Sequence, residues 1–314
     1  MIKVGITGCD HLLAAELVRI LINHPDVQLE WVTASCPQGT RLDQLVPGII
    51  GECDLVVKDP WDCDDVDIVF LGAGLDPLPE TLKKRCLSQD CRVVDLTGGH
   101  NLDHGEGKQW TYGMSEMQRR VLVHDARLVT LPGAVAMAAM LALLPMARNN
   151  LLNNPVSVIA AVGSCLLDSM TAGGLSIEQV AQRQADEVSY ALEQCQPGFN
   201  QSVSVDIASV SMPRVLGATV SFKSEFDEGV VRQLYEQYYD DHNFVFLVDR
   251  SLVTTDVANT NKCLIHIVKK DGCFTLNAGI DGFLKGGAGT AVHAMNLMFG
   301  LHERVGLTLK GTGC

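Results

Sequence analysis

A short loop near the amino terminus combines residue types that suit phosphate binding. Gly8 follows the β-branched apolar run Ile2–Thr7, and a helical pattern over residues 12–22 begins shortly after it. A glycine between a strand and a helix is typical of loops whose backbone N–H groups hold a phosphate at the helix start. Asp10 and His11 occupy the same loop. We expect Asp10 to cap the helix and repel phosphate, and the His11 ring to fill the phosphate space or, in a rearranged loop, to donate a hydrogen bond to it.

The thiols are the second group that could do chemistry. The chain has 11 cysteines, without a CxxC pair or a CxxC…HxxxH spacing. Most are therefore expected to be small buried hydrophobic residues in a reducing compartment. Cys165 could be a reactive nucleophile or a buried structural thiol. We favour the buried structural thiol, because only a lowered pKa would make the cysteine reactive. The terminal Cys314 is expected to be inert, with a tethering or redox role as the alternative.

Two histidines and two aspartates form a third cluster. His100 and His104 lie close in sequence to Asp95 and Asp103, in a glycine-rich segment. These residue types bind metals, but the segment offers no suitable set of four ligands at a sensible spacing. We therefore expect no metal site and predict a solvated surface for these side chains.

Composition excludes several classes of partner. The net charge is −13 and the pI is about 5.0, so neither nucleic acid nor a membrane surface is an expected partner. The longest apolar stretch, residues 134–147, is too short to span a bilayer and includes Pro145. Residues 1–10 indicate the start of a strand and not a signal peptide, so we expect a cytoplasmic protein.

The first half of the chain predicts a parallel sheet. After the opening strand, turn and helix come further apolar runs at residues 27–33, 67–71, 92–96 and 127–130. Continuous apolar runs are typical of parallel strands buried on both faces. A helix is predicted from about residue 135 to 146. The first domain is thus expected to be an α/β, Rossmann-type doubly wound parallel sheet.

The second half predicts a different domain. Several of its strands alternate in polarity, which suits a mixed or antiparallel sheet with one wet face; we place them at 156–161, 202–209, 217–222, 244–248, 262–268 and 274–278. Helices are expected over 177–193 and 228–239, and again through residue 298 after a glycine-rich stretch. We predict a Rossmann-like domain of residues 1–133 plus 287–314 and an α+β catalytic or oligomerisation-type domain of residues 134–286.

Motifs along the whole chain resemble one family. The chain is similar, in order and spacing, to the N-acetyl-γ-glutamyl-phosphate reductases, members of the semialdehyde dehydrogenase superfamily. The similar segments are Ala14–Leu17 (AAEL), Asp95–Thr97 (DLT), Tyr112–Glu116 (YGMSE), Met212 with Arg214, Asp281 with Lys285–Ala288 (KGGA), and Gly289–Leu301 (GTAVHAMNLMFGL).

The resemblance implies a chemistry that this chain has not kept intact. Such enzymes reduce an acyl phosphate to an aldehyde with NADPH in arginine biosynthesis: a thiolate displaces phosphate, and hydride reduces the resulting thioester. The resemblance places the nucleophilic cysteine at Ala134. It places the histidine base within residues 196–201, which contain no histidine; none occurs between His124 and His242. The first step of the family mechanism is therefore expected to be blocked.

The resemblance also identifies altered binding loops. His11 aligns with a glycine of the cofactor loop, and residues 162–170 align with a second glycine loop but lack its later glycines and basic residues. NADP is the implied cofactor, held at Gly8, Asp10 and His11, although these replacements are expected to prevent NADPH binding below about millimolar. Ser164, Arg214 and Lys285 remain as expected substrate-cleft residues.

The leading hypothesis is a catalytically degenerate paralogue, kept as a binding, regulatory or assembly protein. By resemblance it is expected to form a homo-oligomer, a dimer or tetramer, with a further protein partner open. The alternative is an enzyme with rebuilt chemistry in the same cleft, acting on a related acyl or amino-acid derivative with Cys165 as the substitute nucleophile. A third possibility is the family reaction carried out in an unusual way.

Overall fold

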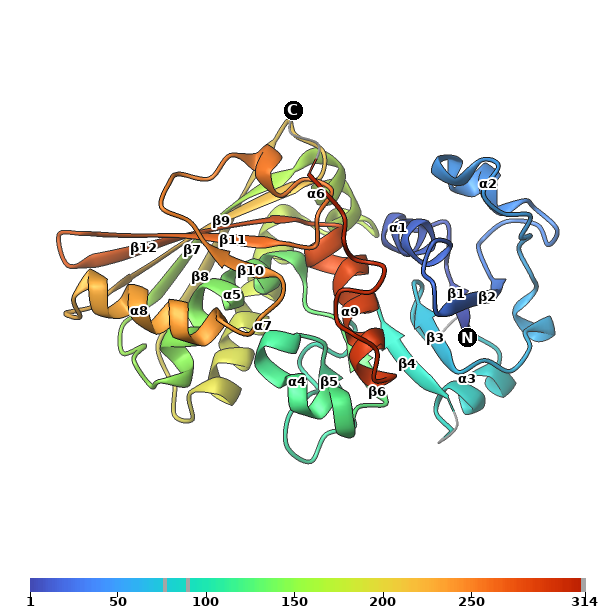
Figure 1. Ribbon diagram of the computed structural model, residues 1–314, viewed down its shortest axis with the longest axis horizontal. Coiled ribbons are helices and arrows are strands. Elements are labelled where there is room, and N and C mark those ends of the chain that lie inside the picture. The colour runs from blue at the N-terminus through green and yellow to red at the C-terminus, as the bar shows by residue number, and fades with distance from the viewer. Residues whose placement is uncertain (76–77, 89–90, 312–314) are drawn as a thin grey trace. The chain divides into compact units, whose positions relative to one another are not determined.

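The computed structural model describes residues 1–75, 78–88 and 91–311, and these pack as two compact units (Figure 1). The first unit comprises Met1–Pro132 and Gly287–Thr308, and the second comprises Gly133–Gly286 with the described residues from Leu309 onward. The sequence-based division kept residues 287–314 together. The difference has a local reason, since the amide of Asn259 donates to the carbonyl of Lys310 at 3.5 Å within the second unit.

The first unit contains the predicted parallel sheet. Its order is β2-β1-β3-β4-β6-β5, and every neighbouring pair is parallel. The strands are β1 (Ile2–Thr7), β2 (Val27–Val32), β3 (Ile68–Leu71), β4 (Arg92–Asp95), β5 (Trp110–Tyr112) and β6 (Leu128–Thr130). β3 is buried throughout, as expected for a strand covered on both faces. The predicted doubly wound α/β class is confirmed.

Helices of the first unit pack with one another as well as with the sheet. The unit contains α1 (Leu12–Leu21), α2 (Leu42–Leu45), α3 (Glu80–Cys86), α4 (Ser115–His124) and α9 (Gly289–Met298), with short 3₁₀ turns at Pro47–Ile49 and Pro60–Asp62. The last helix, α9, contacts both α1 and α4, so a segment that follows the second unit in the sequence completes the first unit. α2, α3, α4 and β5 were not predicted from the sequence.

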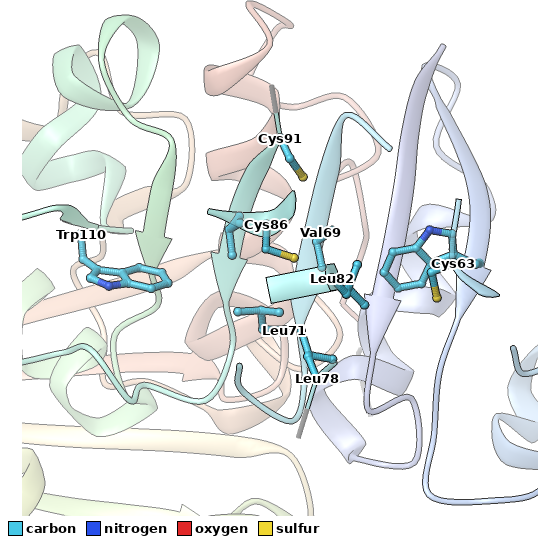
Figure 2. Close-up of a cluster of buried hydrophobic side chains, with 10 residues drawn as sticks. Cys63, Val69, Leu71, Leu78, Leu82, Cys86, Cys91 and Trp110 are labelled. Atoms are coloured by element: carbon cyan, nitrogen blue, oxygen red, sulfur yellow. The ribbon is translucent and has the colours of Figure 1, made fainter. Parts of the chain in front are cut away.

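One hydrophobic cluster of this unit contains several of the thiols (Figure 2). Cys63, Cys86 and Cys91 pack there beside Leu82 and Val69. Of the described cysteines, six are buried, three are partly exposed and one is exposed. Burial raises the pKa of Cys86 to about 12 and that of Cys91 to about 11. Most thiols therefore are buried hydrophobic groups, as predicted, and those in this cluster stay protonated at neutral pH.

The second unit contains the predicted mixed sheet. Its order is β10-β11-β12-β9-β7-β8, with β7–β8 and β10–β11 parallel and the other pairs antiparallel. The strands are β7 (Val156–Gly163), β8 (Val203–Val210), β9 (Val215–Lys223), β10 (Val245–Leu247), β11 (Cys263–Lys270) and β12 (Cys273–Asp281). The helices are α5 (Ala134–Arg148), α6 (Ser164–Thr171), α7 (Ile177–Cys195) and α8 (Glu228–Tyr239), with a 3₁₀ turn at Thr254–Asp256 and a π turn at Leu284–Ala288.

Helix α5 forms the centre of the second unit. It packs against β9, β11, β12, α7 and α8, and all of its residues except Arg148 are buried. Pro145 lies inside the helix and has no N–H to donate to the carbonyl of Leu141, four residues earlier. The hydroxyl of Tyr239 on α8 donates to that carbonyl at 2.5 Å. The tertiary contact thus replaces the helical hydrogen bond that proline removes.

The other face of this sheet is open to solvent. Cross-strand register aligns His266, Asn277, Thr219, Ile159 and Asp206 in one row across β11, β12, β9, β7 and β8. We call this row and its neighbours on the same face the outer face. Ile159 there is 54% exposed. A sheet normally buries each apolar face against another layer, and the outer face has no such layer among the described residues.

No helix in the described part of the chain has the length and apolar character needed to cross a bilayer.

Candidate cofactor and active-site residues

The loop between β1 and α1 has a backbone shaped for close approach. Gly8 has φ +66°, and a Cβ built there would lie 2.9 Å from the backbone nitrogen of Ala73. A Cβ on Gly72 would lie 2.3 Å from the carbonyl oxygen of Thr7. Glycine is required at both positions, because the loops after β1 and β3 are in backbone contact. This packing forms a cradle at the carboxyl ends of two neighbouring strands.

The start of α1 is not closed by Asp10. His11 is the N-cap residue, and no side chain caps the helix. The Asp10 carboxylate instead accepts the backbone N–H of Ser35, which follows β2, at 3.2 Å. The predicted Asp10 cap is wrong. The loop after β2 is drawn close by a backbone hydrogen bond from Cys9 to Thr33 at 2.9 Å, and it supplies a competing donor.

Asp10 nevertheless places a negative charge at this helix start. Partial burial works against ionisation, but hydrogen bonds from its own backbone and from Ser35 hold the pKa of Asp10 below its usual value. The carboxylate is therefore ionised at neutral pH. Asp10 and His11 are both exposed, so the His11 ring that was predicted to fill the phosphate space lies at the surface.

β1 ends in a buried threonine, next to Gly8 in the chain. Thr7 is the last residue of the strand and is 1% exposed. Its Oγ1 atom has no hydrogen-bond partner among the described residues. A buried hydroxyl in this state is unfavourable unless a ligand or water completes it. Together with the uncapped helix and the glycine cradle, it indicates that the residues present suit a dinucleotide phosphate, with Asp10 as the opposing charge.

The turn after β4 contains an aspartate–histidine pair. Asp95 is fully buried, and its Oδ2 atom lies 3.0 Å from Nδ1 of His100. Its Oδ1 atom accepts the backbone N–H of Thr97 at 2.9 Å and the Thr97 hydroxyl at 2.7 Å. The His100 ring stacks on Trp110 with centroids 3.8 Å apart. The predicted solvated surface is wrong here, because Asp95 organises the turn from inside the domain.

His104, the second histidine of that segment, is fully buried as well. Its ring lies 4.3 Å from that of Tyr112, and a β-bridge joins it to Trp110. Desolvation lowers the pKa of His104 to about 4. The imidazole is neutral at pH 7, and this prediction of a solvated side chain also fails. Within the described ranges, no three His, Cys, Asp or Glu side chains are grouped as metal ligands.

Helix α5 begins at Ala134, the position that the resemblance assigns to the nucleophile. The backbone N–H of Gly133 donates to the Glu187 carboxylate at 3.0 Å, and the N–H of Ala136 donates to the Gln184 side chain at 2.9 Å. Both acceptors come from α7 and are nearly buried. A Cβ on Gly286 would lie 2.9 Å from the Ala134 methyl. The helix start is thus enclosed and bonded to side chains of its own unit.

The segment predicted as a second glycine loop is helical. Ser164–Thr171 forms α6, because Leu166 and Leu167 provide a buried apolar face. Ser164 is partly exposed, and Cys165 is exposed in the first turn. The favoured prediction of a buried structural thiol at Cys165 is therefore wrong.

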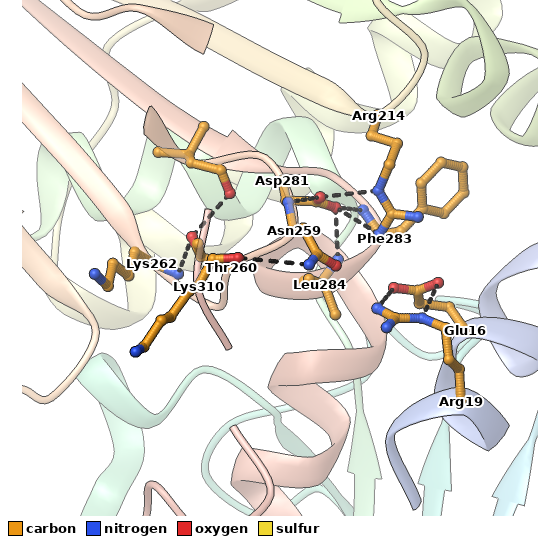
Figure 3. A network of polar contacts seen from close by, with 11 residues as sticks. Glu16, Arg19, Arg214, Asn259, Thr260, Lys262, Asp281, Phe283, Leu284 and Lys310 are labelled. Carbon is orange, nitrogen blue, oxygen red and sulfur yellow. Dashed lines mark hydrogen bonds and ion pairs between the residues drawn. The ribbon is translucent and has the colours of Figure 1, made fainter. Parts of the chain in front are cut away.

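The predicted cationic cleft residues are both engaged by the protein, and Figure 3 shows the contacts of Arg214. The Arg214 guanidinium pairs with Asp281 through Nε at 3.0 Å, and Asp281 also accepts the backbone N–H of Asn259 at 2.7 Å. Lys285 is fully buried, with its ammonium 5.7 Å from the ring centroid of Phe244. Their assignment to a substrate cleft remains a prediction.

The structure groups the predicted residues only in part. Gly8, Asp10 and His11 share one loop, while Gln184 and Glu187 were missed, since they lie about fifty residues from the helix start that they bind. The Asp95–His100 pair was noticed in sequence and misjudged. Cys314 lies outside the described residues.

Profiles of known families match both units. Residues 3–124 match the NAD-binding domain of semialdehyde dehydrogenase, and residues 178–281 match the semialdehyde dehydrogenase dimerisation domain. The chain is 33% identical over 320 residues to the N-acetyl-γ-glutamyl-phosphate reductases of Parabacteroides distasonis and Phocaeicola vulgatus, with 99% of each chain covered.

Solved structures show the same fold at lower identity. Aspartate semialdehyde dehydrogenase II from Vibrio cholerae, complexed with ASA, superposes with a TM-score of 0.73 at 13% identity, covering 95% of this chain and 98% of that one. A probable aspartate-semialdehyde dehydrogenase from Pseudomonas aeruginosa has a TM-score of 0.72 at 17% identity, with the same coverage. These likenesses establish the fold alone.

Proposed function

The chain belongs to the N-acetyl-γ-glutamyl-phosphate reductase family, and from this membership we propose that it binds a nicotinamide dinucleotide, NADP, without carrying out thioester-dependent acyl-phosphate reduction. It is a family member kept for binding, regulation or assembly, or for chemistry that needs no thioester. The observation that carries the proposal is the start of α5, where the side chain is the methyl group of Ala134 and not a thiol.

The surroundings of Ala134 support the loss of thiolate chemistry. A nucleophilic cysteine benefits from a helix N-terminus whose N–H groups and partial positive charge stabilise the thiolate. Here Glu187 and Gln184 accept the N–H groups of Gly133 and Ala136. A carboxylate at this position opposes a second negative charge. The site therefore has no thiol at position 134, and the Glu187 carboxylate beside it would also disfavour a thiolate.

The cofactor part of the proposal rests on the β1–α1 cradle. The first unit matches an NAD-binding domain, and Gly8, the uncapped start of α1 and the Thr7 hydroxyl suit a phosphate. When bound, the nicotinamide supplies a hydride donor or acceptor. Because Asp10 does not occupy the helix N–H groups, the expectation that binding is absent below millimolar is withdrawn in favour of binding that Asp10 weakens.

The deciding experiment is phosphate-dependent NADPH formation from N-acetylglutamate semialdehyde. We expect no turnover above background, whereas calorimetry detects NADPH binding. A family member that carries the cysteine serves as the positive control. Turnover within tenfold of that control would overturn the proposed loss of activity, and absent binding would overturn the cofactor assignment.

Self-association is the second part of the proposal. Residues 178–281 match a dimerisation domain. The outer face of the mixed sheet exposes Ile159 among small and polar side chains and has no covering layer among the described residues. A second copy of the chain is the proposed cover, giving a homodimer or a tetramer built from it.

A rebuilt enzyme is a second candidate, favoured by the Asp95–His100 pair. In that pair the aspartate contacts Nδ1 of the histidine, as in the Asp–His part of a catalytic triad. The exposed Cys165 is the other group available for rebuilt chemistry.

A further inference from the structure

The carboxylate of Asp95 determines the state of the His100 imidazole. Asp95 accepts three hydrogen bonds, two from Thr97 and one from Nδ1 of His100. An ionised carboxylate only accepts, so Nδ1 carries the proton of this contact. In the neutral ring, Nε2 is then the basic nitrogen with an available lone pair.

The ring is held in place from several sides. Trp110 stacks on it at an interplanar angle of 17°, and the Thr97 hydroxyl that donates to Asp95 also accepts the backbone N–H of Gly99 at 3.2 Å. Gly98 has φ +70°, and a Cβ there would lie 2.8 Å from the Asn101 amide. The turn therefore fixes the aspartate, and the aspartate and Trp110 fix the imidazole.

The reactive side of the imidazole remains available. The His100 side chain is 31% exposed, against 1% for Asp95. No described residue forms a hydrogen bond with Nε2 of His100. If His100 only stabilised the turn, its side chain would need neither solvent exposure nor a nitrogen without a hydrogen bond. The neighbouring His104, by contrast, is fully buried, as a structural histidine can be.

The pair lies at the ligand-binding edge of the parallel sheet. β1, β3 and β4 are consecutive strands, and the loops after them meet: Gly8 packs against Gly72 and Ala73, and a Cβ on Gly74 would lie 3.9 Å from the Thr97 side chain. Ligands of doubly wound sheets bind at the carboxyl ends of the strands. His100 is therefore on the same edge as the phosphate cradle, two strands away from β1.

We propose that His100, oriented by Asp95, is an acid–base residue that acts on the hydroxyl or carbonyl oxygen of a small secondary alcohol or ketone bound at the carboxyl end of β4. The proposal rests on the proposed nicotinamide binding. In the alcohol direction the ligand's O–H bond breaks, and Nε2 takes the proton. The resulting imidazolium is stabilised by the Asp95 carboxylate and returns the proton to water. A bound oxidised nicotinamide would accept the hydride from the alcohol carbon, so the reaction would need no thioester.

The first test measures the reactivity of the imidazole itself. Diethyl pyrocarbonate acylates an accessible neutral imidazole nitrogen, and peptide mass spectrometry locates the product. We expect His100 to react, and Asp95→Asn to slow its reaction at least threefold, because the ring loses the carboxylate that accepts the Nδ1 proton and leaves Nε2 as the unprotonated nitrogen. His104 is the internal reference, expected to be unreactive in the folded protein, and Asp103→Asn is the matched control. An unreactive His100, or a rate that Asp95→Asn does not change, would overturn the proposal.

The second test concerns the ligand. Oxidation of propan-2-ol, lactate and 3-hydroxybutyrate is followed with NADP⁺. His100→Gln is expected to lower turnover by roughly 100-fold, the usual contribution of a positioned acid–base group, while calorimetry finds unchanged NADP⁺ affinity. Equal turnover in the variant, or no turnover with any of the three alcohols, would overturn the proposed substrate class. Absent NADP⁺ binding with a reactive His100 would refute the cofactor and leave the acid–base pair standing.

Discussion

The Glu187 carboxylate accepts the backbone N–H of Gly133 at 3.0 Å, one residue before Ala134. This contact predicts that restoring a cysteine does not restore its reactivity. In Ala134→Cys the carboxylate raises the thiol pKa by like-charge repulsion. Alkylation with iodoacetamide at pH 7.5 should be about tenfold slower than in the double variant Ala134→Cys/Glu187→Gln, which corresponds to a pKa difference of about one unit.

Glutamine at position 187 still accepts the Gly133 N–H, so the helix start keeps its hydrogen bond. The matched control is Glu178→Gln in the Ala134→Cys background, which removes a charge near the other end of α7. It should leave the alkylation rate unchanged. Equal rates with and without Glu187 would refute the electrostatic explanation. We also expect no recovery of acyl-phosphate reduction in Ala134→Cys, since residues 196–201, where the resemblance places the base, contain no histidine.

The Asp10 carboxylate predicts a cofactor affinity limited by charge. Asp10→Asn removes one negative charge beside the uncapped start of α1, while its side-chain oxygen can still accept the Ser35 N–H. At about 1 kcal/mol for one nearby exposed charge, the NADPH dissociation constant should fall roughly fivefold. Calorimetry at low ionic strength measures the change, which should shrink as salt is added.

Asp43→Asn is the control for net charge. Asp43 is also ionised, with its pKa lowered by Arg41, and it lies on α2. Its neutralisation should not alter NADPH affinity. If both variants tighten binding equally, the effect comes from the overall charge of the acidic chain and not from the loop.

Much of this organisation was visible in the sequence, for identifiable reasons. α8 begins and ends where its amphipathic pattern predicts, and β3 and β4 follow from short, continuous apolar runs. The helix predicted over residues 135–146 is α5, Ala134–Arg148. It continues past Pro145, because the carbonyl of Leu141 that proline leaves without a helical donor accepts the Tyr239 hydroxyl. The hydrophobic pattern of the sequence was sufficient to predict these elements, because that pattern determines which of their faces are buried.

The site was harder to predict because its contacts are tertiary. Asp10 has the right position to cap α1, and only the chain returning after β2 brings the competing N–H of Ser35. His104 sits in a polar, glycine-rich segment, and its burial depends on the β-bridge to Trp110. α6 was read as a loop from the family alignment, although Leu166 and Leu167 provide the apolar face that makes it helical.

Tyr239 provides a prediction about stability. Tyr239→Phe leaves the Leu141 carbonyl buried without a donor, because Pro145 has no N–H. Urea denaturation should show a loss of about 1–3 kcal/mol in the free energy of unfolding. Tyr235→Phe is the matched control: its hydroxyl donates to the carbonyl of Ala142 at 2.5 Å, whose helical partner Met146 retains an N–H. The control should cost about 1 kcal/mol or less, and equal losses would contradict the role assigned to Pro145.

The outer face of the second unit predicts a defined way to break the oligomer. Ile159→Lys places a charge on this face, on the strand next to the edge strand β8, where the charge would have to be desolvated against a second copy. Light scattering should show the wild-type protein at a multiple of 33.9 kDa and the variant at the monomer mass. Val230→Lys changes an equally exposed apolar residue on α8 and should leave the mass unaltered. A monomeric wild-type protein would contradict the proposed interface.

The buried imidazole of His104 predicts how stability responds to acid. Desolvation lowers its pKa in the folded protein to about 4, against about 6.5 when unfolded. Between pH 6.5 and pH 4, His104 is therefore protonated in the unfolded chain but stays neutral in the folded protein. The free energy of unfolding should fall by about 3 kcal/mol between pH 6.5 and pH 4 on account of this residue, and this contribution should level off below pH 4.

Urea denaturation across this pH range measures the slope in three proteins. His104→Phe keeps a ring against Tyr112 and removes the titrating group, so its stability should depend less on pH than that of the wild type. Some slope remains, since burial also lowers the pKa of His24. Tyr112→Phe keeps the imidazole and should keep the full slope whatever its stability at pH 7. If the stability of His104→Phe depends on pH as strongly as that of the wild type, protonation of His104 does not cause the loss of stability in acid.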